Sequence, residues 1–267
     1  MPKSNPWPFL PLLTVLTLSF YLPKPLPAEQ DGLQWVKISK LHPTQFTYGA
    51  LEVESRRKNL AAEKKEHGKH GLDEFLRERA GSAVIGPDGQ LYLSNGHHLA
   101  RAILENGGDH MYIKIVADLS HLSKDAFWKK MESNHYVYLY DRKGKKRTGE
   151  ELPDEIEKLK NDPYRSLAWL LRKSGGFLKD TKVFFQEFLW GNFLREKMPD
   201  FEGGDRRSWE RGVKEAMKDW AFSQKAANLP GFIGTTKTHP EVCRRALEGL
   251  SDVLDERFAD LSWKKLR

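Results

Sequence analysis

Apolar and polar residues alternate in several stretches of the first half of the chain, and this period is typical of β-strands. One strand is predicted in LQWVKISKL, which begins at Leu33, and another in MYIKIVADL, which begins at Met111. SAVIGPDGQLYL, from Ser82, is typical of a hairpin because two apolar runs flank a Pro-Asp-Gly turn. A further strand, YVYLY, leads into the basic turn RKGKKR.

Helical patterns lie between these strands. EVESRRKNLAAEKKE (52–66) and DEFLRERA (73–80) are rich in helix-forming residues. Another helix is expected to begin near Gly96 and to end at Gly107, and KDAFWKKMES follows a segment with capping residues. Strands and helices therefore intermingle up to about residue 150, which predicts an α+β fold with a small mixed sheet.

Strand patterns are lacking after residue 150, where the sequence predicts helices. Asp162 as N-cap, Pro163 at the first helical position and Gly175 beyond the end delimit PYRSLAWLLRKS. Three more helices are expected in VFFQEFLWGNFLREKM, RSWERGVKEAMKDWAFSQKAA and PEVCRRALEGLSDVLDERF. In the last of these, Thr238 and Glu241 have the spacing of a capping box.

These patterns predict a domain organisation of three parts: residues 1–28, an α+β domain at 29–150 and a helical region at 151–267. We expect the core of the helical region to contain its aromatic residues rather than to leave them free to stack on bases. Those residues are Phe184, Phe188, Trp190 and Trp220.

The first 28 residues have the features of a secretory signal peptide. MPKSNPW carries one lysine, an apolar run extends from Leu10 to Leu22, and PKPLPAEQ offers cleavage after Ala28. An uncleaved anchor is the alternative because Leu26 is larger than the usual residue at that site, but the run is short for a span of about 20 residues. The prediction is a periplasmic or secreted protein with no membrane contact after cleavage.

The composition and net charge indicate which class of binding partner suits the chain. With 39% hydrophobic residues the chain can bury a core, and its net charge of +7 with a pI near 9.3 favours anionic partners such as nucleic acid or nucleotides. Cys243 is the single cysteine, so the chain forms no internal disulfide and no thiolate metal site.

The segment YLSNGHHLARAIL has the pattern of an anion site. A glycine at a helix start lets a ligand approach unpaired backbone amides, and the helix dipole favours negative charge there. We expect Ser94 or Asn95 to cap this helix, with Gly96 open to the ligand and His97 and His98 as donors. Arg101 lies one turn further on. Capping and packing of the two histidines is the alternative, and adjacent histidines point too far apart to chelate one metal.

Several blocks in order resemble the ParB-like nuclease family, within the ParB and sulfiredoxin fold superfamily. The blocks are PTQFTYGALEV, GPDGQLYLSNGHHLARAIL, KIVADLS, FWKKM, DPYRSLAWLLRKSGGF and FFQEFLWGNFLR. The resemblance spans roughly residues 36–195 and implies a ParB/sulfiredoxin-like domain that binds nucleotide phosphates at a helix start. Gly96, His97 and His98 match that motif.

The motif departs from its relatives at three positions. His97 occupies the place of the sulfiredoxin catalytic cysteine, which argues against sulfinic acid reduction. Asn95 replaces an aspartate that many relatives have, and Leu99 replaces a common arginine, which leaves Arg101 as the nearest guanidinium.

The resemblance also points to a carboxylate. Some superfamily members are free serine kinases, and Glu52 resembles their general base by position. A buried carboxylate beside an anion pocket can deprotonate water or an alcohol. The alternative is an ordinary glutamate in a first helical turn, which the helix dipole stabilises. Thr44 and Gln45 either donate hydrogen bonds to the ligand or hold their loop.

Other charged residues allow two interpretations each. His67 and His70 have the spacing of a weak metal site or lie in a glycine-flanked loop, and Asp118 caps a helix or supports a histidine. Arg165 either reaches the site from the helical region or pairs locally.

Three functions follow as alternatives. The first is hydrolysis of phosphodiester or phosphate-ester bonds, with His97 or His98 as acid or electrostatic stabiliser and Glu52 activating water. The second is a nucleotide-dependent phosphotransferase, and the third is a non-catalytic nucleotide or nucleic-acid binding module. Export favours hydrolysis, because donor nucleotides are scarce outside the cytoplasm. The cofactor is left open, with a divalent metal such as Mg²⁺ as the candidate and no metal ligand assigned.

Overall fold

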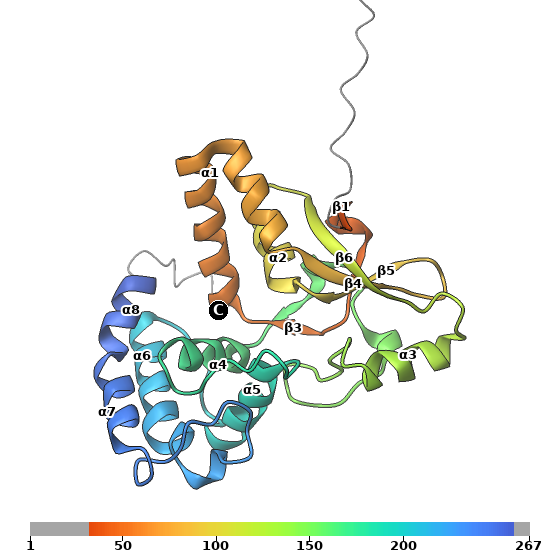
Figure 1. Ribbon diagram of the computed structural model, residues 1–267. Helices are drawn as coiled ribbons and strands as arrows, with labels where there is room; N and C mark the ends of the chain where they lie inside the picture. Colours follow the sequence, from red (N-terminus) through yellow and green to blue (C-terminus); the bar gives the residue numbers. More distant parts are fainter. Residues whose placement is uncertain (1–31, 259–267) are drawn as a thin grey trace, which may run out of the picture. The chain divides into compact units, whose positions relative to one another are not determined.

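The predicted hairpin forms the centre of a five-stranded sheet (Figure 1). A computed structural model describes residues 32–258 of the chain, so the predicted signal peptide lies outside the described residues. The strand order is β1-β6-β4-β5-β2, with antiparallel pairs β1–β6 and β4–β5 and parallel pairs β6–β4 and β5–β2. The strands are β1 (Leu33–Lys37), β2 (Leu41–Pro43), β4 (Gly81–Ile85), β5 (Leu91–Asn95) and β6 (His110–Asp118). The predicted mixed sheet and α+β class are confirmed.

Helices cover both faces of this sheet. Successive residues of β4 point to opposite faces, so Ala83 joins a core with α1 and α2, whereas Val84 joins a core with α3. Leu93 and Tyr92 of β5 divide in the same way. The helices are α1 (Ala50–Glu78), α2 (His97–Glu105) and α3 (Lys124–Ser133), and Ser123 caps α3 as the capping segment predicts.

Helix α1 is two helical segments joined at a kink. Gly68 has φ of +65°, which places it outside the helical region. The sequence ends one helix at HGKHG and begins another at DEFLRERA, so the break is predicted, although the helical segments run closer to it than expected.

The rest of the chain is mostly helical. Asp162 accepts a hydrogen bond from the Tyr164 amide, Pro163 opens α4 and Gly175 follows its end with φ of +84°, all as predicted. The short strand β7 (Lys160–Asn161) pairs in parallel with β3 (Thr47–Tyr48). The helices are α4 (Pro163–Lys173), α5 (Gln186–Lys197), α6 (Arg206–Glu215), α7 (Pro240–Glu248) and α8 (Leu250–Phe258), with a π-helical turn at Ala216–Ala221.

Two expectations for individual side chains of this region are wrong, and the last predicted helix is divided at Gly249 into α7 and α8. Thr238 does not cap α7: its hydroxyl bonds with Thr235, and His239 occupies the N-cap without a side-chain hydrogen bond. Phe184 is 54% exposed instead of lying in the core, whereas Phe188 and Trp190 are buried and Trp220 packs against the core. Phe184 lies just before α5, where it contacts His135 of another segment.

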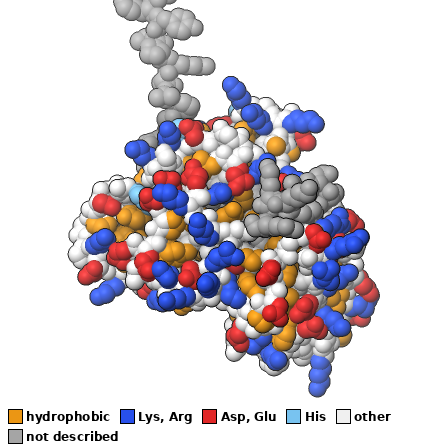
Figure 2. All heavy atoms as spheres, turned by 180° about the vertical axis from the view of Figure 1, so that it is seen from behind, with side chains coloured by type: hydrophobic (Ala, Val, Ile, Leu, Met, Phe, Trp, Pro, Cys, Tyr) orange, Lys and Arg blue, Asp and Glu red, His pale blue; other side chains and the backbone are white. Residues whose placement is uncertain are grey.

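The basic excess is not gathered on the face that Figure 2 shows, where lysine and arginine side chains alternate with aspartate and glutamate. Between residues 32 and 258 no helix is both long and apolar enough to span a bilayer.

Candidate functional site

Helix α2 follows β5 directly in the sequence, and its N-cap residue is a glycine without a capping hydrogen bond from any side chain. Gly96 has φ of +108°, and a Cβ there would lie 3.1 Å from the Cα of Gly81. The predicted cap by Ser94 or Asn95 is wrong, because the Ser94 hydroxyl bonds with Ser82 and Asn95 is exposed without a capping bond. The first amides of α2 are therefore not satisfied by a capping side chain.

Both histidines of the motif are buried and accept hydrogen bonds from the backbone. The Thr44 amide donates to Nε2 of His97 at 3.0 Å, and the Gly49 amide donates to Nε2 of His98 at 3.0 Å. Burial lowers the pKa of each ring to about 3, so both imidazoles are neutral at pH 7. The rings thereby join α2 to the loop that precedes α1.

Glu52 lies beside His98 in the first turn of α1. Its carboxylate accepts from Arg56 at 2.7 Å and from Arg165 of α4 at 2.7 Å, and its Oε2 lies 3.8 Å from Nε2 of His98. Burial opposes ionisation, but the guanidinium groups of Arg165 and Arg56 hold the pKa of Glu52 well below its usual range. The carboxylate is therefore ionised at neutral pH.

Arg165 reaches this site from the helical region, which confirms the first of its two interpretations. Its side chain is 6% exposed, and only Nη2 has a partner, the Glu52 carboxylate. The Nε and Nη1 atoms are buried without a hydrogen-bond acceptor among the described residues. Unpaired donors of a buried cation are costly, so Nε and Nη1 can donate hydrogen bonds to an anionic oxygen of a ligand.

A second carboxylate adjoins the cluster from α5. Glu187 pairs with Arg172 at 2.7 Å and with Lys179 at 3.4 Å, and the charges of Arg165, Lys179 and Arg172 lower its pKa against the effect of burial. The complete group, called the charge cluster below, has four cations and two carboxylates and so an excess of two positive charges. Its members are Glu52, Arg56, Arg165, Arg172, Lys179 and Glu187.

The other predicted ligand-binding residues hold the surroundings together. The Thr44 hydroxyl donates to the carbonyl of Leu93, and the Gln45 amide donates to the carbonyl of Thr47. Arg101 pairs with Glu105 at 2.7 Å and donates to the backbone carbonyl of Glu157, and among the described residues it forms no ion pair with Glu52.

Sequence reasoning did not assign Arg56, Arg172, Lys179 or Glu187 to the site. The spacing of Glu52 and Arg56, four residues apart on a helix, is a signal for their ion pair. Glu187 carries no local signal, because its partners come from α4 and from the loop after it.

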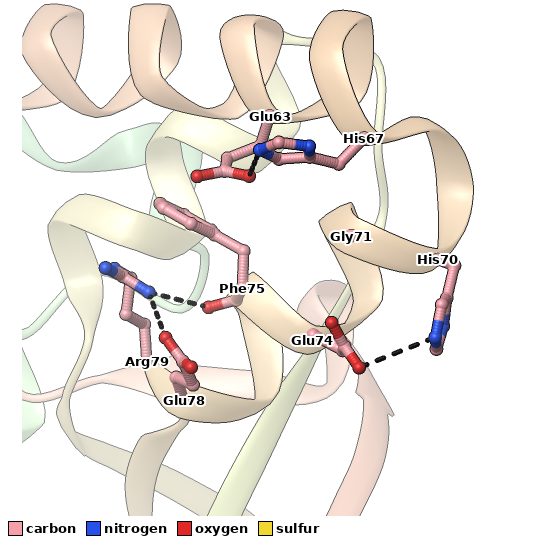
Figure 3. Close-up of a pocket in the computed structure, with 8 residues that line it drawn as sticks. All are labelled: Glu63, His67, His70, Gly71, Glu74, Phe75, Glu78 and Arg79. Carbon is pink, nitrogen blue, oxygen red and sulfur yellow. Dashed lines mark hydrogen bonds and ion pairs between the residues drawn. The ribbon is translucent and has the colours of Figure 1, made fainter.

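A surface pocket of about 520 Å³ lies at the kink of α1 (Figure 3). Figure 3 shows that His67 points toward Glu63, whereas His70 turns outward to Glu74, with nitrogen–oxygen distances of 3.8 and 3.5 Å. The two histidines therefore belong to separate pairs. In the described part of the chain no three histidine, cysteine, aspartate or glutamate side chains form a group that could hold a metal ion.

Asp118 does not contact either histidine of the motif. Its carboxylate accepts from the amide and the hydroxyl of Ser120, which closes the turn before α3. Ser123, rather than Asp118, caps that helix.

Comparisons with known proteins agree with this fold. The chain matches a crystal structure of protein Atu1540 from Agrobacterium tumefaciens with 36% sequence identity and a TM-score of 0.65, over 76% of this chain and 97% of that one. No curated protein is significantly similar in sequence. A model of the family described as "Putative ParB-like nuclease" matches residues 34–196, more than half of the chain. The chain therefore belongs to the ParB-like nuclease family, as the ordered sequence blocks indicate.

Proposed function

We propose that the chain binds a phosphate group at the charge cluster and hydrolyses phosphodiester or phosphate-ester bonds there. The observation that carries this proposal is the buried guanidinium of Arg165, which has two unpartnered donors in a group with excess positive charge. A planar guanidinium binds phosphate oxygens through paired hydrogen bonds. Membership of the ParB-like nuclease family supports this substrate chemistry.

Glu52 acts as the general base in this proposal. Its pKa is low in the free protein, but a bound phosphate adds negative charge beside it and engages Arg165, and both effects raise the pKa of the carboxylate. The carboxylate then takes a proton from water while the water oxygen bonds to phosphorus. The bond from phosphorus to the leaving oxygen breaks, and the leaving alkoxide takes up the proton that Glu52 had removed.

The two histidines position other groups in this proposal and do not act as acids. Each Nε2 accepts a backbone hydrogen bond, and each ring is neutral at pH 7. His98 fixes Gly49, the residue before α1, and so sets the place of Glu52 three residues later. No step of the proposal passes through Mg²⁺, because the described residues do not supply a cluster of metal ligands.

A non-catalytic binding module is the second candidate. The observation that favours it is the double ion pair of Glu52, since a carboxylate held by two guanidinium groups is a weak base. In that case the charge cluster would only hold the phosphate.

Glu52→Gln separates the two candidates. We expect at least a 100-fold loss of hydrolysis of single-stranded DNA, RNA or nucleotides, assayed with and without Mg²⁺, because a positioned base contributes about 10²- to 10⁴-fold. Phosphate binding should be retained or become tighter, because the substitution removes one negative charge and releases Arg165. Arg165→Gln should weaken binding.

Arg244→Gln and Glu248→Gln are the matched controls. They break a similar ion pair at 2.7 Å on α7, outside the charge cluster, and should change neither binding nor hydrolysis. Hydrolysis that survives both Glu52→Gln and Arg165→Gln unchanged would remove the proposed site. Binding that depends on Arg165 without turnover in the unsubstituted protein would establish the binding module.

Export is part of the proposal. Its support is the apolar run and the Ala28 cleavage motif, which lie outside the described residues. The amino-terminal sequence of the mature protein tests it. A chain that begins at Glu29 is expected, and a chain that retains its first 28 residues would contradict it.

A further inference from the structure

A cleft of about 460 Å³ lies between the segment after α3 and the start of α5. We call it the aromatic cleft. Five of its lining residues carry rings, namely His135, Tyr138, Tyr140, Phe184 and Phe185.

Three rings of the aromatic cleft, those of His135, Tyr140 and Phe184, are open to solvent. Phe184 is 54% exposed and Tyr140 is 36% exposed. His135 and Phe184 lie almost parallel, with ring centroids 5.8 Å apart and planes inclined by 19°. Exposed planar surfaces of this kind can stack against a planar ligand.

The backbone of the aromatic cleft is strained. His135 and Phe185 have φ of +55° and +56°, and they are the only non-glycine residues with positive φ in the described part of the chain. Such strain persists only where the surrounding structure enforces it, and it concentrates at functional sites. Both strained residues line this one cleft.

Positive charge borders the aromatic cleft. Lys182 lines it, is exposed and has no ion pair among the residues described. Lys146 of the basic turn 142–147 also lines it. Glu132 is the acidic residue in the lining, and it pairs with Lys146 at 3.1 Å. The rim therefore suits an anionic ligand.

The aromatic cleft and the charge cluster share a wall. The Tyr138 ring packs on the Phe188 ring with centroids 4.5 Å apart, and Phe188 lies 5.1 Å from the guanidinium of Arg165. The Tyr138 amide also donates to the carbonyl of Thr44, next to the motif histidines. A ligand in the aromatic cleft is thus close to the proposed phosphate site.

We propose that the aromatic cleft holds an unpaired base of a single-stranded nucleic acid whose backbone is bound at the charge cluster. This inference rests on the proposed function. Rings and cations together match a nucleotide, whose base stacks and whose phosphate is anionic. Bases inside a duplex are already stacked and paired, so the aromatic cleft selects single strands.

The test compares two probes that differ only in their bases: a labelled phosphorothioate oligothymidylate, which resists hydrolysis, and an abasic strand of the same length and backbone. Fluorescence anisotropy measures the affinity of the full chain for each. We expect Phe184→Ala to weaken binding of the oligothymidylate about 10-fold, because one base–ring stacking contact is lost, and to leave the abasic strand unaffected. Phe184→Trp should retain the affinity.

Leu178→Ala is the matched control, since Leu178 is an exposed apolar residue, 65% accessible, outside the lining of the aromatic cleft. It should change neither affinity. Oligothymidylate binding that is insensitive to Phe184→Ala, or no tighter than abasic binding, would overturn the aromatic cleft as a base site while the phosphate site stands. If neither probe depends on Arg165, the proposed function itself fails.

Discussion

The two motif histidines hold backbone segments of the site together and remain neutral in the folded protein. Each imidazole accepts a backbone hydrogen bond from the loop that leads into α1, and each is neutral when folded. The adjacent carboxylate can therefore remain ionised through the guanidinium groups of Arg56 and Arg165. The two arginines therefore keep the carboxylate of Glu52 ionised, whereas the two histidines fix the position of the loop before α1.

This arrangement predicts a loss of stability in mild acid. The pKa of His97 is about 3 in the folded protein and near 6.5 when unfolded, so the unfolded state binds more protons as pH falls below 6.5. The contribution of the neutral His97 ring to the free energy of unfolding is fully present above pH 6.5 and is lost as the pH falls toward 3. At pH 5 the loss is about 2 kcal/mol. His97→Gln, which keeps an acceptor for the Thr44 amide, should lose less stability between pH 7 and 5.

Urea unfolding at the two pH values measures this difference. The depressed pKa of Glu52 acts in a separate window, because its contribution is lost only as pH falls below the unfolded value near 4.5. His121→Gln is the control at an exposed histidine and should keep the pH dependence of the unsubstituted protein. Equal losses in His97→Gln and the unsubstituted protein would contradict the neutral buried ring.

The sequence predicts the individual residues of the site better than their partners. The glycine–histidine motif and Glu52 stand out because helix starts have recognisable residue patterns. One partner of Glu52 is Arg165, which is 113 residues away, and no local pattern determines a contact at that separation. The unpaired donors of Arg165 are a property of packing and are visible only in the structure.

At the scale of elements, the start of α2 depends on a close approach of two backbones. Gly96→Ala would place a Cβ 3.1 Å from Gly81 and 3.2 Å from the methyl of Met111, at φ of +108°. We expect a loss of about 2–3 kcal/mol in the free energy of unfolding, because backbone strain and crowding act together. Gly89 has φ of +75°, and a Cβ there would have no atom within 4 Å. Gly89→Ala should therefore lower the free energy of unfolding by only about 1 kcal/mol. Similar losses in the two variants would show that crowding is unimportant.

The ends of a helix are predicted correctly where several neighbouring residues favour the same boundary. Asp162, Pro163 and Gly175 delimit α4 as predicted because cap, proline and glycine agree. Thr238 fails as a cap because it can bond equally well within its own turn, to Thr235. The π-helical turn at Ala216–Ala221 has no comparable sequence signal, and the helical pattern alone predicts a continuous α-helix there.

At the scale of the whole molecule, the first turn of α1 belongs to two cores. Ala50 and Leu51 are buried with the aromatic residues of α4 and α5, whereas Val53 and Leu60 pack on the sheet. The Leu51 amide donates to the hydroxyl of Ser166, and β3 pairs with β7. Residues 32–258 accordingly form one compact unit.

A fragment of residues 29–150 tests the consequence. Without α4, Glu52 loses Arg165, and the apolar residues Ala50 and Leu51 become exposed. Removing one partner of a buried ion pair costs about 3–5 kcal/mol, which is a large part of the stability of an ordinary domain. We therefore expect the fragment to lack a cooperative urea transition and to be cleaved by protease faster than residues 29–267.

The same fragment with Glu52→Gln separates charge from packing. If the unpaired carboxylate is the main defect, the substitution restores part of the transition, because a neutral amide is less costly to bury. If exposure of Ala50 and Leu51 dominates, the substitution changes little and protease sensitivity persists. A fragment 29–150 that unfolds as cooperatively as the longer chain would show that the sheet and its helices do not need the helical region, and that the residues of the site come together only after both parts have folded.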